Sequence, residues 1–279
     1  MRILAGLVLL VVVGGCWVLA EEAVVQGYGW ERDVLYREVV EMPDEAAAYA
    51  RERCRLDVYY PEGVEGFTTV VWFHAGGLRM GQRYVPGELL RQGFAVVAVD
   101  YRLNPEVEAP AYIEDAAAAV AWVFEHIEAY GGDPDRVIVA GASAGGYLVA
   151  MIGLDRRWLA AEGVDADRLL GIASLSGQAI THVTVREERG GDRLRAEVDD
   201  LAPVFHVRGD APALMIVTGD RELELLGRYE ENAYFARMMK LSGHERTELY
   251  ELEGFDHAGV ERPAHGLLLR FVKTLMAGE

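Results

Sequence analysis

The sequence RVIVAGASAGGYLVAMI occupies residues 136–152. Its apolar beginning predicts a buried strand, and Tyr147–Ile152 predicts a helix. Between them, GASAG at residues 141–145 matches the pattern G-x-S-x-G. In a sharp strand-to-helix turn of this kind the serine is held out at the C-terminal edge of the sheet, and the two glycines avoid clashes within the turn. The sequence therefore predicts Ser143 as a nucleophile at a helix N-terminus, where negative charge is stabilised.

A second glycine-containing motif, HAGG at residues 74–77, follows another apolar stretch. Glycines allow backbone N–H groups to converge on one point, as an oxyanion hole requires. We expect the N–H groups of Gly76 and Gly77, together with that of Ala144 after the nucleophile, to bind a developing oxyanion. His74 is expected to shape this loop rather than to act as a base.

HAGG, DYRL at residues 100–103 and GASAGG at residues 141–146 together resemble the α/β-hydrolase superfamily. The likeness is to its esterase branch, which includes hormone-sensitive-lipase-like enzymes, feruloyl- and acetyl-xylan-esterase-like (BD-FAE-like) enzymes and arylformamidases. It extends over roughly residues 50–275. The resemblance implies an α/β-hydrolase fold, with a mostly parallel sheet of about eight strands and helices on both faces. It also implies that Asp100 and Arg102 support the oxyanion loop from behind.

The order of catalytic residues in this superfamily is nucleophile, acid, then histidine. EGFDHA at residues 253–258 resembles the histidine loop of the family, so His257 is the expected base. GDRE at residues 219–222 resembles the acid loop, in which the acid lies three residues after the glycine. This spacing predicts Glu222, with Asp220 as the alternative. The acid would accept a hydrogen bond from the imidazole and stabilise its protonated form.

Apolar stretches alternate with helical patterns along most of the chain, which is typical of an α/β sheet. The expected strands are residues 53–60, 68–73, 94–99, 136–140, 170–175, 214–218 and 247–252, and the expected helices are residues 111–130, 230–242 and 263–277. No Pro- or Ser-rich linker divides the sequence, so we expect one domain over residues 21–279. The irregular stretch 177–211 is expected to be either a loop that covers a pocket or a solvated surface loop.

The first 20 residues have the pattern of a secretory signal, with Arg2 followed by an apolar stretch that ends at Val13. This stretch is shorter than the roughly 20 residues that a membrane-spanning helix needs. We expect cleavage after Ala20 and export to the periplasm or the medium. The alternatives are a lipoprotein signal, in which Cys16 is lipidated and anchors the protein in the membrane, and an uncleaved anchor. Removal of the leader leaves Cys54 as a single cysteine, without a partner for a disulfide.

The chain contains 27 Lys and Arg against 45 Asp and Glu among 279 residues, a net charge of −18. Such a charge repels nucleic-acid phosphates, and no basic patch compensates for it, so nucleic-acid binding is not expected. Hydrophobic residues make up 51% of the chain, as in folded globular proteins rather than disordered ones. No cluster with metal-ligand spacing and no phosphate-binding glycine loop is apparent, so no metal or other cofactor is expected.

These motifs predict a serine hydrolase that cleaves short-chain carboxylic esters through Ser143, Glu222 and His257. The resemblance extends the expected substrates to acyl groups on carbohydrate. Three alternatives remain open: an arylformamidase, a small peptidase with the same triad, and a hydrolase-fold binding protein without catalytic activity. The natural substrate, its acyl-chain length and the oligomeric state are not predicted.

Overall fold

The computed structural model describes residues 12–13, 16–17, 27–38, 43–225 and 227–278. Its main sheet has eight strands in the order β10-β9-β8-β7-β5-β6-β4-β3. In chain order they are β3 (Gly27–Leu35), β4 (Arg55–Glu62), β5 (Phe67–Phe73), β6 (Ala95–Val99), β7 (Gly132–Ala142), β8 (Gly171–Leu175), β9 (Ala213–Gly219) and β10 (Thr247–Leu252). The pairs β3–β4 and β4–β6 are antiparallel, and the neighbours from β6 to β10 are all parallel. The expected mostly parallel sheet is thereby confirmed.

The central strands are buried on both faces, which explains why their sequences are continuously apolar rather than alternating. Every residue of β5 and β6 is buried. Successive side chains point to opposite faces of the sheet, so Val71 and Phe73 join one core cluster while Val70 and Trp72 join the other.

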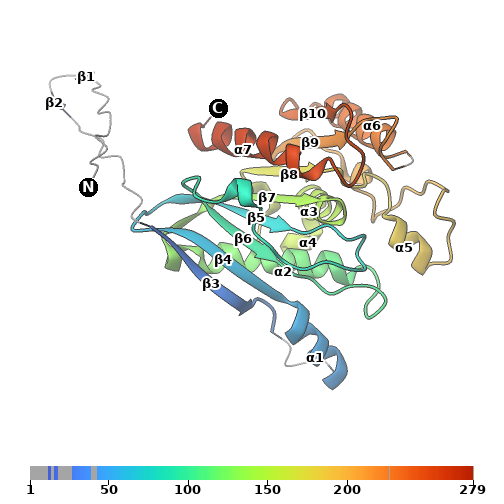
Figure 1. The fold of residues 1–279 in the computed structure, drawn as a ribbon, viewed down its shortest axis with the longest axis horizontal. Helices are drawn as coiled ribbons and strands as arrows, with labels where there is room; N and C mark the ends of the chain where they lie inside the picture. Colours follow the sequence, from blue (N-terminus) through green and yellow to red (C-terminus); the bar gives the residue numbers. More distant parts are fainter. Residues whose placement is uncertain (1–11, 14–15, 18–26, 39–42, 226, 279) are drawn as a thin grey trace.

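Helices cover both faces of the sheet, as Figure 1 shows. On one face lie α2 (Ala111–His126), α3 (Ala144–Leu154) and α6 (Arg228–Leu241), and on the other lie α7 (Glu261–Ala277) and the short helix η1 (Gly87–Leu89). The remaining helices are α1 (Asp44–Arg53), α4 (Arg156–Ala161), α5 (Val183–Glu188), η2 (Ile127–Tyr130), η3 (Ala166–Arg168) and η4 (Pro203–His206). The last turn of the expected helix 111–130 is therefore the separate 3₁₀ turn η2. Cys54, between α1 and β4, is a buried free thiol.

The stretch 177–211, expected to be irregular, contains helices α5 and η4. The expected leader, residues 1–20, lies outside the described residues except for the two short paired strands β1 (Val12–Val13) and β2 (Cys16–Trp17). Among the described helices, none is both long enough and apolar enough to cross a membrane.

Candidate active site

Ser143 occupies a sharp turn between the end of β7 and the start of α3. Its backbone has φ 51° and ψ −112°, a conformation that residues with a side chain rarely adopt. The turn is held on both sides, because Ser143 N–H donates to the Leu175 carbonyl at 2.7 Å and Tyr147 N–H donates to the Ser143 carbonyl at 3.0 Å. The sheet and the helix thus enforce the strained conformation that exposes the hydroxyl.

The two glycines that flank the serine are required by close backbone contacts. A Cβ atom on Gly145 would lie 2.1 Å from the Phe73 carbonyl oxygen, and one on Gly141 would lie 2.5 Å from the Gly145 carbonyl carbon. Both distances are far below van der Waals contact. The motif predicted from the sequence therefore has a direct steric cause: α3 begins in contact with the ends of β5 and β7.

His257 reaches Ser143 from the loop between β10 and α7. Its Nε2 atom lies 2.9 Å from Ser143 Oγ, a hydrogen-bond distance. The residues are 114 positions apart in the chain, and the parallel sheet brings them together because β7 and β10 both end at the same edge. The structure thus unites the predicted nucleophile with the predicted base.

The carboxylate that contacts His257 belongs to Glu224, so the prediction that Glu222 contacts it is wrong. Glu224 Oε2 lies 2.9 Å from His257 Nδ1, and the Glu224 side chain is almost completely buried. Glu222, in contrast, is exposed. The alternative, Asp220, is also not the partner of the histidine, because its carboxylate accepts the backbone N–H groups of Glu222 and Gly254.

Asp220 explains why the acid lies two residues further along than the spacing predicts. Its side chain caps the turn after β9, and its carbonyl accepts the Glu224 N–H at 2.8 Å, as in one turn of helix. This turn directs Glu224 back over the sheet edge and Glu222 toward solvent. The sequence signal that we missed is the spacing of four between Asp220 and Glu224, which is one helical turn.

Hydrogen bonds keep Glu224 ionised despite its burial. Burial acts to raise the pKa of this carboxyl, but hydrogen bonds from His257, from the Ser176 hydroxyl and from the Gly219 N–H lower the pKa to about 2. Ser176, at the end of β8, also lies 3.1 Å from His257 Nδ1. The Glu224 carboxylate is therefore negatively charged in the folded protein at neutral pH. It contacts Nδ1 of the imidazole, whereas Ser143 contacts Nε2.

The HAGG loop follows β5 and presents two glycines with left-handed backbones, Gly76 at φ 128° and Gly77 at φ 63°. A Cβ on Gly76 would lie 1.8 Å from the Met80 carbonyl oxygen, so only glycine fits there. Within the described part of the chain, the N–H groups of Gly76, Gly77 and Ala144 have no hydrogen-bond acceptor. The three predicted oxyanion donors are thus available to a ligand.

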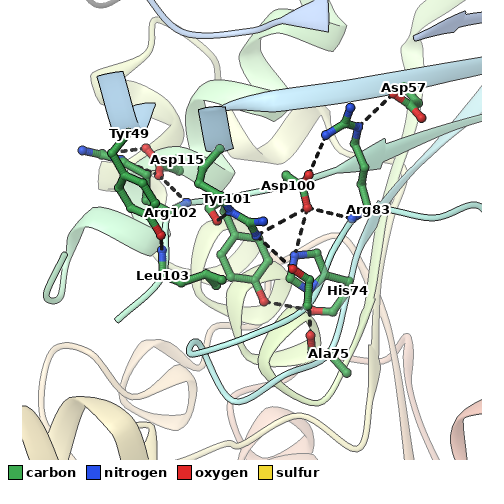
Figure 2. Close-up of polar contacts among 12 residues, drawn as sticks. Tyr49, Asp57, His74, Ala75, Arg83, Asp100, Tyr101, Arg102, Leu103 and Asp115 are labelled. Atoms are coloured by element: carbon green, nitrogen blue, oxygen red, sulfur yellow. Dashed lines mark hydrogen bonds and ion pairs between the residues drawn. The ribbon is translucent and has the colours of Figure 1, made fainter. Parts of the chain in front are cut away.

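A buried polar network supports this loop from behind, as shown in Figure 2. His74 stacks on Tyr101 with ring centroids 4.4 Å apart, and the Tyr101 hydroxyl donates to the His74 carbonyl. Asp100 lies 3.4 Å from His74 Nε2 and accepts hydrogen bonds from the backbone and side chain of Arg83. Burial acts to raise the pKa of Asp100, but His74, Arg53 and Arg83 lower it, so the carboxylate stays charged.

Arg102 has a different role from the one that the resemblance implies. Its guanidinium donates twice to Asp115 on α2, at 2.8 and 2.7 Å, and Figure 2 shows this pair at a distance from His74. Arg102 therefore joins α2 to the segment after β6 rather than contacting the oxyanion loop. Of the two expected supports, Asp100 alone lies against His74.

The sequence of this chain is similar to those of known esterases. The BD-FAE family model matches residues 56–167, which include the oxyanion loop and Ser143. Esterase LipC of Mycobacterium tuberculosis is 30% identical over 67% of this chain and 50% of its own length. Carboxylesterase NlhH of the same organism is 42% identical over 34% of this chain and 32% of its own length. The chain is thus similar in sequence to esterases of the α/β-hydrolase superfamily. It spans half or less of the length of these relatives.

Solved structures share the fold of this chain over nearly its whole length. A truncated carbohydrate esterase from gut microbiota superposes with a TM-score of 0.71 at 16% identity, covering 92% of this chain and 98% of its own. Esterase 2 of Thermogutta terrifontis superposes with a TM-score of 0.67 at 22% identity, covering 91% and 95%. At these identities the likeness establishes the α/β-hydrolase fold alone.

The protein has a cavity of about 320 Å³ in front of Ser143. Its walls come from the oxyanion loop, the ends of β7 and β8, the stretch 177–183, the start of α6 and the histidine loop. The lining residues are Ala75, Gly76, Gly77, Ala142, Ser143, Leu175, Ser176, Gln178, His182, Val183, Leu225, Arg228, His257, Ala258, Val260 and Glu261. Most of the exposed lining is apolar, which suits the non-reacting part of a small organic ligand.

Helix α5 is fastened to the oxyanion loop beside this cavity. The Thr184 hydroxyl donates to the Gly77 carbonyl at 2.6 Å, and Glu187 pairs with Arg79 at 2.8 Å. Glu188 accepts hydrogen bonds from Asn104 and from the Ala109 backbone on the other side. The stretch 177–211 therefore contributes a wall of the site that is tied to the body of the protein at several points.

Proposed function

We propose that the protein is a serine carboxylesterase that cleaves short-chain carboxylic esters through Ser143, His257 and Glu224. The observation that carries the proposal is the continuous chain of contacts from Ser143 Oγ to His257 Nε2 at 2.9 Å and from His257 Nδ1 to Glu224 at 2.9 Å. This chain ends at a cavity lined by Gly76 and Gly77, whose N–H groups, like that of Ala144, have no acceptor within the described residues. Nucleophile, base, acid and anion-binding donors are the parts that acyl transfer to serine requires.

In the first half of the reaction, His257 Nε2 takes the proton of Ser143 as Oγ attacks the carbonyl carbon of the ester. The carbonyl oxygen becomes an oxyanion and accepts hydrogen bonds from Gly76, Gly77 and Ala144. Each such donor contributes about 3 kcal/mol to the transition state. His257 then gives its proton to the departing alcohol oxygen, and an acyl-serine remains.

In the second half, His257 takes a proton from water, whose oxygen attacks the acyl carbon. Collapse of the second tetrahedral intermediate breaks the bond to Ser143 Oγ, which recovers the proton from His257, and the carboxylic acid leaves. Glu224 accepts the Nδ1 hydrogen throughout, so it fixes the tautomer and stabilises the imidazolium. Its low pKa keeps it in the charged form that this role needs.

The decisive experiment is hydrolysis of 4-nitrophenyl acetate and butyrate by the purified protein. We expect turnover that Ser143→Ala abolishes while circular dichroism and the unfolding midpoint stay close to those of the wild type. A panel of formanilides and aminoacyl anilides in the same assay separates ester from amide preference. Absence of ester turnover in a folded wild-type protein that still binds these esters would favour the non-catalytic alternative.

We further propose that the protein is exported, on the basis of the pattern in residues 1–20. Cell fractionation with mass spectrometry of the mature N-terminus tests this. An N-terminus at Glu21 supports cleavage after Ala20, whereas a lipidated Cys16 supports the lipoprotein alternative.

A further inference from the structure

A second cavity, of about 420 Å³, adjoins the cavity in front of Ser143. Four residues line both cavities and form a shared wall: Gln178, Val183, Leu225 and Arg228. The remaining lining comes from Arg186 on α5 and from residues 192–194. The second cavity therefore lies next to the place where the carbonyl of an ester would bind.

The charge of the second cavity is opposite to that of the protein. Three arginines line it, Arg186, Arg193 and Arg228, and Asp192 is the single carboxylate among its lining residues. Glu231, which lies behind the wall, pairs with Arg228 at 2.7 Å. One net positive charge remains at the cavity even after this pair is counted, in a chain whose net charge is −18.

Arg186 is the unusual member of this group because it is buried without a counter-charge. It is 3% exposed, and its guanidinium donates to backbone carbonyls alone, those of Thr181, Asp192, Arg193 and Arg195. Within the described residues it forms no ion pair with a carboxylate. A buried charge without a partner is costly, so a site that keeps one is expected to gain from an anionic ligand.

We propose that this second cavity is a subsite for a carboxylate group carried by the ester substrate, an inference that rests on the proposed esterase function. The guanidinium donors are available: within the described part of the chain, Nη2 of Arg186 and Nη2 of Arg228 donate to no acceptor. Arg193 forms no ion pair there either and lies exposed at the rim. Planar guanidinium groups bind carboxylates through paired, charge-assisted hydrogen bonds.

Matched pairs of esters test the subsite on each side of the scissile bond. On the acyl side, mono-4-nitrophenyl adipate is compared with 4-nitrophenyl heptanoate, and on the alcohol side, 4-acetoxybenzoate is compared with its methyl ester. We expect kcat/KM for the anionic member of at least one pair to exceed that of the neutral member by about tenfold or more, as charge-assisted hydrogen bonds permit. The pair that shows the preference identifies which part of the substrate enters the cavity.

Substitutions of arginine test whether the preference for anionic esters arises at the second cavity. Arg193→Gln and, more strongly, Arg193→Glu are expected to lower the ratio of anionic to neutral kcat/KM. The matched control is Arg237→Gln, which removes the same charge from an exposed position on α6 outside both cavities, and it should leave the ratio unchanged. An equal fall in the ratio for Arg193→Gln and Arg237→Gln would mean that net charge, and not the cavity, sets the preference.

Two outcomes separate this inference from the proposed function. If the wild type hydrolyses the neutral esters but prefers neither anionic ester, the subsite is refuted and the esterase assignment stands. If the wild type hydrolyses no ester, the Ser143→Ala protein is titrated with the same pairs to measure binding without turnover. Tighter binding of the anionic esters then supports the subsite, and equal or weaker binding refutes it.

Discussion

The carboxylate next to His257 belongs to Glu224, whereas the spacing of the sequence motif predicts Glu222. Glu224→Gln removes the charge next to His257 Nδ1 and favours the wrong tautomer, so we expect kcat/KM for 4-nitrophenyl acetate to fall by about 10³- to 10⁴-fold. Glu222→Gln is the matched control two positions away, where the side chain is exposed, and it should stay within about twofold of the wild type. A larger loss of kcat/KM for Glu222→Gln than for Glu224→Gln would show that Glu222, and not Glu224, is the catalytic acid.

The same carboxylate makes stability depend on pH. The pKa of Glu224 is about 2 in the folded protein and 4.5 as an ordinary value. Its contribution is therefore fully present above about pH 4.5 and is lost as the pH falls toward 2, because protonation then favours the unfolded chain. We expect the difference in free energy of unfolding between the wild type and Glu224→Gln to shrink by up to about 3 kcal/mol between pH 6 and pH 2.

Urea unfolding of the two proteins at several pH values measures this difference, and comparison with a variant cancels the titration of all other groups. The difference in free energy of unfolding is expected to change between pH 4.5 and pH 2. If the free energies of the two proteins stayed parallel over that interval, the low pKa of Glu224 would be contradicted.

At the scale of elements, the link between α5 and the oxyanion loop is expected to act on the chemical step. Thr184→Val keeps the buried shape but removes the hydroxyl that binds the Gly77 carbonyl, leaving that carbonyl without its partner. We expect kcat to fall by about tenfold with little change in KM, because donors that act in the transition state lose their fixed position. Thr184→Ser keeps the hydroxyl and should restore most of kcat, whereas equal losses in both variants would indicate a packing role alone.

The sequence predicts the buried strands of the sheet well because each has a local cause, whereas the edge strand β3 and the helices α1 and α4 are not predicted. Buried parallel strands such as β5 and β6 require continuous apolar residues, and the turn at Ser143 requires glycines at fixed positions, so both leave a clear pattern. His257 is predictable from the loop after the last strand. Glu224 is not, because its position depends on how Asp220 folds the turn after β9, and several acidic residues in that turn fit a linear motif equally well.

The stretch 177–211 also shows where prediction from sequence stops. Helix α5 is six residues long and has no strong periodic pattern of its own. Its place is set by contacts that are distant in sequence, such as Glu188 with Asn104 and Thr184 with Gly77. Such contacts become visible when the fold is known, and the carboxylate-binding subsite proposed above depends on the place of α5.

At the scale of the whole molecule, Asp115 connects three regions of the chain. Its carboxylate is fully buried and accepts hydrogen bonds from the backbone and guanidinium of Arg102 and from Arg37, which follows β3. Asp115→Asn leaves the charge of Arg102 buried and unpaired, so we expect a loss of about 3–5 kcal/mol in the free energy of unfolding.

Urea denaturation measures this loss, with Asp135→Asn as the control. Asp135 pairs with Arg168 on the surface, where an ion pair contributes less than about 1 kcal/mol. Similar destabilisation by the two substitutions would show that the buried pair is not a major link between β6, α2 and the edge of the sheet.

The buried thiol of Cys54 has a practical consequence for measuring how the protein opens. Cys54 has no exposed surface, and its pKa is raised to about 12, chiefly by burial and further by the nearby charge of Asp115. A thiol in this state is inert to disulfide reagents until the chain around it separates. In a protein expressed without residues 1–20, Cys54 is the single cysteine, so its labelling rate should report transient unfolding directly, without an engineered probe.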